Sequence, residues 1–305
     1  MNPLQLAVDA LSLGSQYALI SLGIGIVFGI MRMVNFAHGE FITIGAYSLL
    51  VPSVGVVSEP FLAALPVPLL ILGVLVVVAA TTLLTERFAF RPLRGRNADG
   101  ASLLISSFTV SYLLQSIVLF LYLGRPKSVS IFPELTAQVD FAGMRISTAD
   151  VVTILVAASL LVALVAFMKR SRTGVEMRAA AEDFTMARLL GIKADRVIAV
   201  AFLISGLLAA VVALLYVSKT GTADFRMGTP LAIAGFVATV IGGMGNLPGA
   251  VFGGFFLGVG STALQALLPA SLRPARDAFL YGLVIFVLLW RPQGLFARKS
   301  SGERI

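Results

Sequence analysis

Two ionisable side chains stand close together in an apolar part of the chain. His38 is the only histidine, and Glu40 follows it in the run Asn35, Phe36, Ala37, His38, Gly39, Glu40. An ionisable group at the centre of a bilayer costs about 2.5–3.5 kcal/mol on insertion scales, so it persists where it has a purpose or lies near the interface. His38 and Glu40 could line or gate a path through a membrane, or they could cap and bridge the start of a helix. A proton relay is less favoured, because the other apolar segments offer no matching chain of acidic partners.

A glycine-rich break at 242–249 interrupts a second apolar region, the uncharged stretch 229–272. Irregular backbone at membrane depth survives only inside protein or beside a water-filled cavity, and paired breaks in the two halves of a transporter point to its substrate path. The run 35–40 breaks the first apolar region in the same way, between the segments 14–31 and 41 onward. The two breaks, 35–40 and 242–249, therefore predict a translocation path. Its candidate residues are Asn35, His38, Gly39, Glu40, Gly242, Gly243, Gly245, Asn246, Pro248 and Gly249. The alternative is that the glycines only let neighbouring helices pack closely.

A polar segment at about 169–196 could receive a partner protein. Thr173 and Glu176 fit a capping box and Gly191 fits a helix stop, which predicts two short helices bent near Glu182 and Asp183. The residues that we expect to form the docking surface are Glu176, Arg178, Ala179, Ala180, Ala181, Glu182, Asp183, Arg188 and Gly191.

The same segment carries apolar side chains that are unusual in an exposed loop. They are Phe184, Met186, Leu189 and Leu190, and they would form a small apolar knob rimmed by charged residues. Such a combination is typical of a docking site. The alternative is an interfacial helix that lies on lipid and is anchored by its basic residues.

Motifs of enzymes are missing from the sequence. It has no G-x-x-x-x-G-K-[ST] phosphate loop, no H-E-x-x-H and no G-x-S-x-G, and it has no cysteine for a metal or redox site. We therefore expect no catalytic residue, no metal and no cofactor bound by this chain. If its activity depends on ATP, partner subunits must bind and hydrolyse the nucleotide.

Membrane-spanning helices must position these candidate residues. The 305 residues are 58% hydrophobic and only 12% charged, about half the charged fraction of a soluble domain. Uncharged runs of about the length that crosses a bilayer recur along the chain. They lie at 10–31, 61–84, 103–123, 151–168 and 197–217, with two more in 229–272 and weaker candidates at 41–58 and 278–290. The prediction is an all-α, polytopic membrane protein with about eight or nine spans in one domain, 1–305.

The placement of basic residues predicts the orientation. Most of the 23 Lys and Arg residues fall in 87–96, in 169–196 and in the tail from Arg291, and such clusters mark the cytoplasmic side. The net charge of +8 is therefore explained by orientation and by anionic lipid, without nucleic acid. The parity of the spans leaves the side of the N-terminus open, because 41–58 need not cross fully.

Five ordered motifs resemble one known family. They are the run from Gly14 to Leu19 (GSQYAL), VNFAHGEF at 34–41, RAAAEDFTMARLLGI at 178–192, GGMGNLPGAVFGG at 242–254 and RPQGLF at 291–296. Together they are similar to the high-affinity branched-chain amino acid permeases of LivH type, over nearly the whole chain. Any single motif alone would be weak.

The resemblance implies a permease subunit of a bacterial ABC importer in the inner membrane. It implies a pore of two related permease subunits or a homodimer, two ABC ATPase subunits and a periplasmic substrate-binding protein. It maps the ATPase-docking loop onto 178–192 and the pore onto the two helix breaks. Related permeases carry urea, short amides or other amino acids, so the cargo stays open. The alternative from another class is an ion-coupled secondary carrier or a channel that works without an ATPase.

Overall fold

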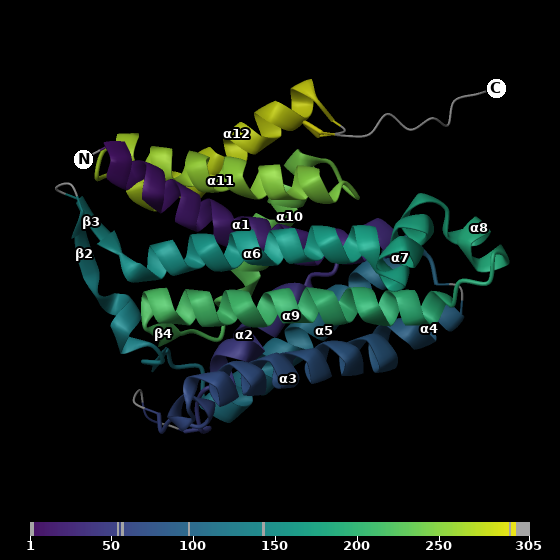
Figure 1. The fold of residues 1–305 in the computed structure, drawn as a ribbon, viewed down its shortest axis with the longest axis horizontal. Helices are drawn as coiled ribbons and strands as arrows, with labels where there is room; N and C mark the ends of the chain where they lie inside the picture. The colour runs from purple at the N-terminus through teal and green to yellow at the C-terminus, as the bar shows by residue number, and fades with distance from the viewer. Residues whose placement is uncertain are drawn as a thin grey trace.

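A computed structural model describes residues 3–53, 55, 58–96, 98–141, 144–292 and 294–296. The helices are α1 (Pro3–Met31), α2 (Ala37–Tyr47), α3 (Val67–Thr85), α4 (Arg91–Gly95), α5 (Gly100–Tyr122), α6 (Thr148–Arg170), α7 (Arg172–Glu182), α8 (Phe184–Leu189), α9 (Ala194–Thr220), α10 (Gly228–Gly242), α11 (Leu247–Leu267) and α12 (Arg276–Trp290). The long helices run roughly side by side (Figure 1). The all-α, multi-span fold predicted from the sequence is confirmed.

The described part of the chain contains only two small sheets. Strand β1 (Lys127–Ser128) pairs with β4 (Thr222–Ala223), and β2 (Gln138–Phe141) pairs with β3 (Met144–Ser147) as an antiparallel hairpin.

The centre of the bundle is α1, which is buried along most of its length and contacts α9, α10 and α11. Small residues allow the close approach of α11. A Cβ at Gly258 would overlap the backbone of Gly14, and a Cβ at Gly254 would overlap the backbone of Ala18. The absence of side chains at these glycines therefore lets the backbones of α1 and α11 touch, as small residues commonly do in membrane helices.

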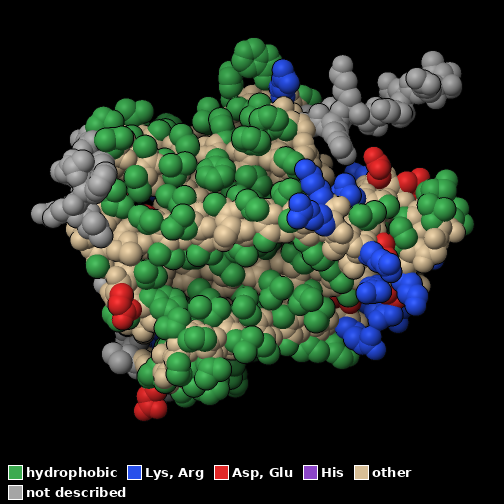
Figure 2. All heavy atoms as spheres, in the orientation of Figure 1, with side chains coloured by type: hydrophobic (Ala, Val, Ile, Leu, Met, Phe, Trp, Pro, Cys, Tyr) green, Lys and Arg blue, Asp and Glu red, His purple; other side chains and the backbone are tan. Residues whose placement is uncertain are grey.

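The outer helices present apolar side chains to their surroundings. In α3, α5 and α6 only about a fifth of each apolar window is buried, at 22%, 22% and 17%. Figure 2 shows hydrophobic side chains over the flank of the molecule, whereas Lys and Arg gather at one end, around α4, α7 and α8. This end is cytoplasmic by the positive-inside rule, and the N-terminus lies at the opposite, external end (Figure 1).

Each of the nine predicted apolar segments contains a helix, but among the described residues only six helices are long enough to cross a bilayer alone. The three shorter ones are α2, α10 and α12. The weak prediction at 41–58 fails in its bounds, because the helix is Ala37–Tyr47 and the chain then turns through irregular backbone. Short stretches outside the α-helices precede α2 (32–36) and α10 (221–227), so each of these two crossings is part helix and part irregular backbone.

Candidate functional site

The first predicted break is buried between three helices. The Nδ1 atom of His38 lies 2.9 Å from the hydroxyl of Ser205 on α9, and a Cβ at Gly23 on α1 would overlap the His38 ring. Asn35 closes the turn before α2, because its Oδ1 accepts the N–H of Ala37 at 3.1 Å. His38 and Asn35 therefore fix the start of α2, which agrees with the structural alternative for His38.

Glu40 lies on the other side of α2, in a small polar cluster. Its Oε1 accepts hydrogen bonds from the hydroxyls of Thr229 at 3.3 Å and Ser111 at 3.5 Å. Gln115 donates to the Thr229 hydroxyl at 3.3 Å. The carboxylate is 1% exposed, and its Oε2 has no partner among the described residues. We call Glu40, Ser111, Gln115 and Thr229 the Glu40 cluster.

The N-termini of two short helices meet at this cluster. Gly39 in the first turn of α2 touches Gly228 at the start of α10, and a Cβ on either glycine would overlap the carbonyl of the other. Free N–H groups and the helix dipole favour negative charge at such ends. The first turns of α2 and α10 therefore lie beside Glu40, deep in a bundle that is otherwise apolar.

The second predicted break lies at a different level. Gly242 and Gly249 touch through their backbones, Gly243 and Gly245 have positive φ values of 97° and 84°, and Asn246 caps α11 by accepting the Gly249 N–H at 3.3 Å. The length of α10, roughly 21 Å at 1.5 Å per residue, separates this turn from the Glu40 cluster. The two breaks therefore lie at opposite ends of the short helix α10.

The C-terminal motif covers that turn. The N–H of Leu295 donates to the carbonyl of Ile241 at 2.7 Å, and the Asn246 side chain donates to the carbonyl of Phe296. A ring contact between Phe252 and Phe296 adds to it, with centroids 5.1 Å apart. Of the predicted path residues, Asn246 therefore belongs to a turn that the tail closes, and Pro248 lies in the first turn of α11.

The predicted docking segment forms two short helices at the cytoplasmic end, as expected, with the bend at Asp183. The capping-box prediction is wrong: Ser171, two residues before Thr173, caps α7 by accepting the Gly174 N–H at 2.9 Å. Asp183 caps α8 in the same way through the Met186 N–H at 2.9 Å.

Most of the expected docking residues are accessible. Arg178, Glu182, Asp183, Arg188 and Gly191 are exposed, and Glu176, Ala179 and Ala181 are half-buried. Ala180 differs, because it is buried and holds α7 against the bundle. Leu189 and Leu190 are each 77% exposed, so α8 presents an uncovered apolar tip.

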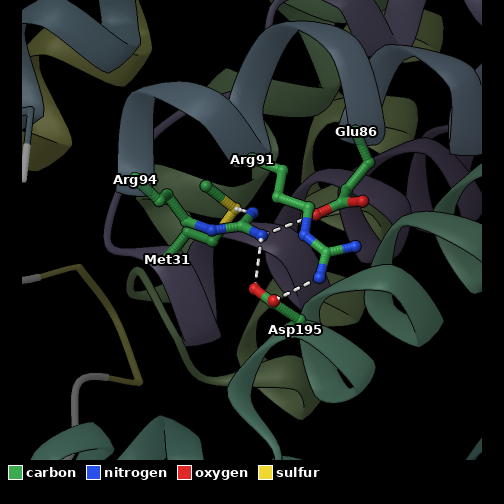
Figure 3. Close-up of polar contacts among 5 residues, drawn as sticks. All are labelled: Met31, Glu86, Arg91, Arg94 and Asp195. Carbon is green, nitrogen blue, oxygen red and sulfur yellow. Dashed lines mark hydrogen bonds and ion pairs between the residues drawn. The ribbon is translucent and has the colours of Figure 1, made fainter. Parts of the chain in front are cut away.

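A charged groove of about 1110 Å³ runs between α4, α8 and the start of α9. Arg94 binds Glu86 at 2.6 Å and Asp195 at 3.4 Å, and Arg91 binds Asp195 at 2.6 Å (Figure 3). These pairs fix α4 against α9 beneath the docking helices. The ion pairs therefore connect α4, at the cytoplasmic end, to the spanning helix α9.

Sequence reasoning missed Ser111, Gln115 and Thr229. A signal existed for two of them: Ser107, Ser111 and Gln115 recur every four residues and so form one polar stripe on an apolar helix. Thr229 carried no signal, because its role depends on the contact between α2 and α10.

Comparisons with known proteins identify the family. The family model for the permease component of branched-chain amino acid transport systems matches residues 6–289. The permease proteins BraD of Pseudomonas aeruginosa and LivH of Escherichia coli K12, both of high-affinity branched-chain amino acid transport systems, are each 35% identical to the chain. The alignment covers 97% of this chain and 96% of each relative.

A second permease of the same kind of system in Escherichia coli K12, LivM, is 26% identical over 94% of this chain and 69% of its own length. The match to the family model extends from the first turn of α1 to the last turn of α12, so it spans both the Glu40 cluster and the docking helices. The chain belongs to the family of permease components of branched-chain amino acid transport systems, and it is a multi-pass protein of the inner membrane.

Proposed function

We propose that the chain forms part of the translocation path of an ATP-driven importer of branched-chain amino acids. The observation that carries the proposal is the relationship to two such permeases over nearly the whole chain. Two ATPase subunits bind and hydrolyse ATP, and a periplasmic binding protein delivers the amino acid. The chain itself supplies the path and the surface that receives force.

The second permease is a related chain or a second copy of this one. One organism, Escherichia coli K12, has both a LivH and a LivM permease to which this chain is similar, which supports a pair of related subunits. The open apolar flanks of α3, α5 and α6 leave room for such a neighbour beside lipid.

The ATPases dock on α7 and α8. The support is the exposed apolar tip formed by Leu189 and Leu190, flanked by charged side chains at Glu182 and Arg188. An apolar centre with a charged rim is the usual composition of a protein interface. ATP-driven closure of the two ATPases moves these helices and switches the path between inward-facing and outward-facing states.

The path passes the Glu40 cluster. A branched-chain amino acid has an apolar side chain and a zwitterionic head, so it needs an apolar route with few polar groups. The free Oε2 of Glu40 is suited to the ammonium group, and the Thr229 and Gln115 side chains lie beside it at the accessible edge of α10 and α5.

The substitution Glu40→Gln tests this assignment, because it removes the charge and keeps the shape. We expect uptake of labelled leucine into proteoliposomes that hold the complete transporter to fall by about tenfold or more, which corresponds to one charge-assisted hydrogen bond of about 1.5–3 kcal/mol. Glu59→Gln, in the external loop, is the matched control and should transport normally. Normal uptake by Glu40→Gln would remove Glu40 from the path.

The same proteoliposomes distinguish the cargo and the class of transporter. Uptake of leucine that requires ATP supports the proposal. ATP-driven uptake of urea or a short amide instead would keep the importer and change its substrate, whereas uptake that follows an ion gradient without ATP would indicate a secondary carrier.

A further inference from the structure

Arg32 connects the docking segment to the turn before the Glu40 cluster. It follows α1 directly, and its Nη2 atom donates to the carbonyl of Ala181 at 2.9 Å. Ala181 lies in the last turn of α7, where carbonyl groups have no partner within the helix and where the helix dipole favours a cation. The contact joins residues that are 149 positions apart in the sequence.

The backbone at Arg32 adopts a conformation that usually requires glycine. Its φ is 54°, in the left-handed region, and its N–H closes the last turn of α1 on the Phe28 carbonyl at 2.8 Å. Among the described residues, Leu123 is the only other non-glycine with positive φ. Helices commonly end in this way with glycine, which has no side chain. Arginine at this position adds a guanidinium group at the end of α1, which a glycine would lack.

The chain between Arg32 and the cluster is short and held at both ends. Residues 33–36 lead to α2, Met33 is buried, and Asn35 closes the turn on Ala37. Glu40 stands in the first turn of α2. Because only four residues separate Arg32 from α2, a displacement of Arg32 should also displace the start of α2.

The end of α1 is also held on its other side. Arg94 approaches the sulfur of Met31 at 4.0 Å while it binds Glu86 and Asp195 (Figure 3). The helix end thus lies between α7 and the ion pairs of α4 and α9. The buried face of α7 packs on α6, α9 and α1, so the Ala181 carbonyl is held in place relative to the end of α1.

We infer that Arg32 couples movement of the docking helices to α2 and the Glu40 cluster. The inference rests on the proposed function, because the movement comes from ATPases bound at α7 and α8. Without the guanidinium the ATPases still bind and hydrolyse ATP, but their movement does not reach the path. The transporter then consumes ATP with little transport.

The test compares three substitutions in the complete transporter, reconstituted in proteoliposomes. Arg32→Gly accepts the left-handed backbone and removes only the side chain, Arg32→Ala also strains the backbone, and Arg32→Lys keeps a donor. Arg170→Ala, at an exposed arginine in the last turn of α6, is the matched control. The readouts are ATPase co-purification, ATP hydrolysis and leucine uptake.

For Arg32→Gly we expect normal co-purification of the ATPases and a ratio of leucine transported to ATP hydrolysed that is about 5- to 150-fold lower, the range of typical coupling energies. Arg32→Lys should recover part of the ratio, and Arg170→Ala should match the unsubstituted protein. A normal ratio in Arg32→Gly would overturn the inference. Loss of ATPase binding in Arg32→Gly would also overturn it, because Arg32 would then serve docking.

A labelling experiment separates this inference from the proposed function. The chain has no cysteine, so Pro230→Cys beside Thr229 gives a single reporter at the exposed start of α10. Its labelling rate by a thiol reagent should change between the nucleotide-free and the ATP-trapped transporter, and this change should be absent with Arg32→Gly. An unchanged rate in the Pro230→Cys protein that keeps Arg32 refutes alternating access itself, whereas a change that survives the addition of Arg32→Gly refutes only the role of Arg32.

Discussion

Replacing Gly228 by alanine should separate the two short helices that hold Glu40. A Cβ at Gly228 would lie 2.5 Å from the carbonyl carbon of Gly39 and would overlap the carbonyl oxygen. Both atoms belong to the backbone, so no side chain can turn away and α10 must shift from α2. The hydroxyl of Thr229, the next residue, would then move away from Glu40.

The expected cost follows from this geometry. Extra volume in a well-packed interior costs about 1–3 kcal/mol. Alanine is favoured over glycine in a helix by about 1 kcal/mol, which offsets part of this loss. Gly282→Ala supplies the matched control, because Gly282 is exposed within α12 and a Cβ there would have nothing within 4 Å. This control retains the gain in helix propensity and carries no steric cost.

Thermal unfolding of the two variants in detergent compares these effects. We expect Gly228→Ala to unfold at a lower temperature than the parent protein and Gly282→Ala at an equal or higher one. Leucine uptake should fall in Gly228→Ala and stay normal in Gly282→Ala. If Gly228→Ala were as stable and as active as Gly282→Ala, the close contact between α2 and α10 would be refuted, together with the placement of Thr229 beside Glu40.

Two further predictions concern the docking tip and the ion pairs. Leu189→Glu should abolish co-purification of the ATPases while membrane insertion and stability stay normal. The control is Leu272→Glu, in the loop at the opposite end, and this variant should bind the ATPases normally. Equal recovery of ATPases with both variants would disprove docking at α8. Asp150→Asn should lower the free energy of unfolding by about 1.5–3 kcal/mol, because its buried carboxylate loses a charge-assisted bond of 2.6 Å to Lys219. Asp195→Asn should cost about 0–1 kcal/mol, because the Asp195 side chain is 54% exposed; the reverse order would contradict the burial of Asp150.

Much of the fold was predictable, because apolar runs of spanning length have few other solutions in a membrane protein. The docking segment was predictable as well: the bend at Asp183 and the stop at Gly191 follow from local capping chemistry. The start of α7 was less certain, since both Ser171 and Thr173 can cap a helix. Packing selects Ser171, whose hydroxyl accepts the Gly174 N–H against the end of α6.

The composition of the candidate site was only partly predictable. Glu40 stands out in any reading, because an acidic residue in an apolar segment is rare. Its partner Thr229 is 189 positions away, and the local sequence around either residue does not predict that contact. The two helix breaks were expected to line one path together, but the length of α10 puts them at different levels. Periodicity reports which face of a helix is polar, not which helices cross or at what depth.

Whether Glu40 lies on the path of an ATP-driven importer is tested most directly by leucine uptake into proteoliposomes that contain this permease, its partner permease, the ATPases and the binding protein. We expect uptake that requires ATP and the binding protein and that is lost with Glu40→Gln, although the complex still assembles and hydrolyses ATP. Uptake that continues without ATP, or that is unaffected by Glu40→Gln, would contradict this expectation.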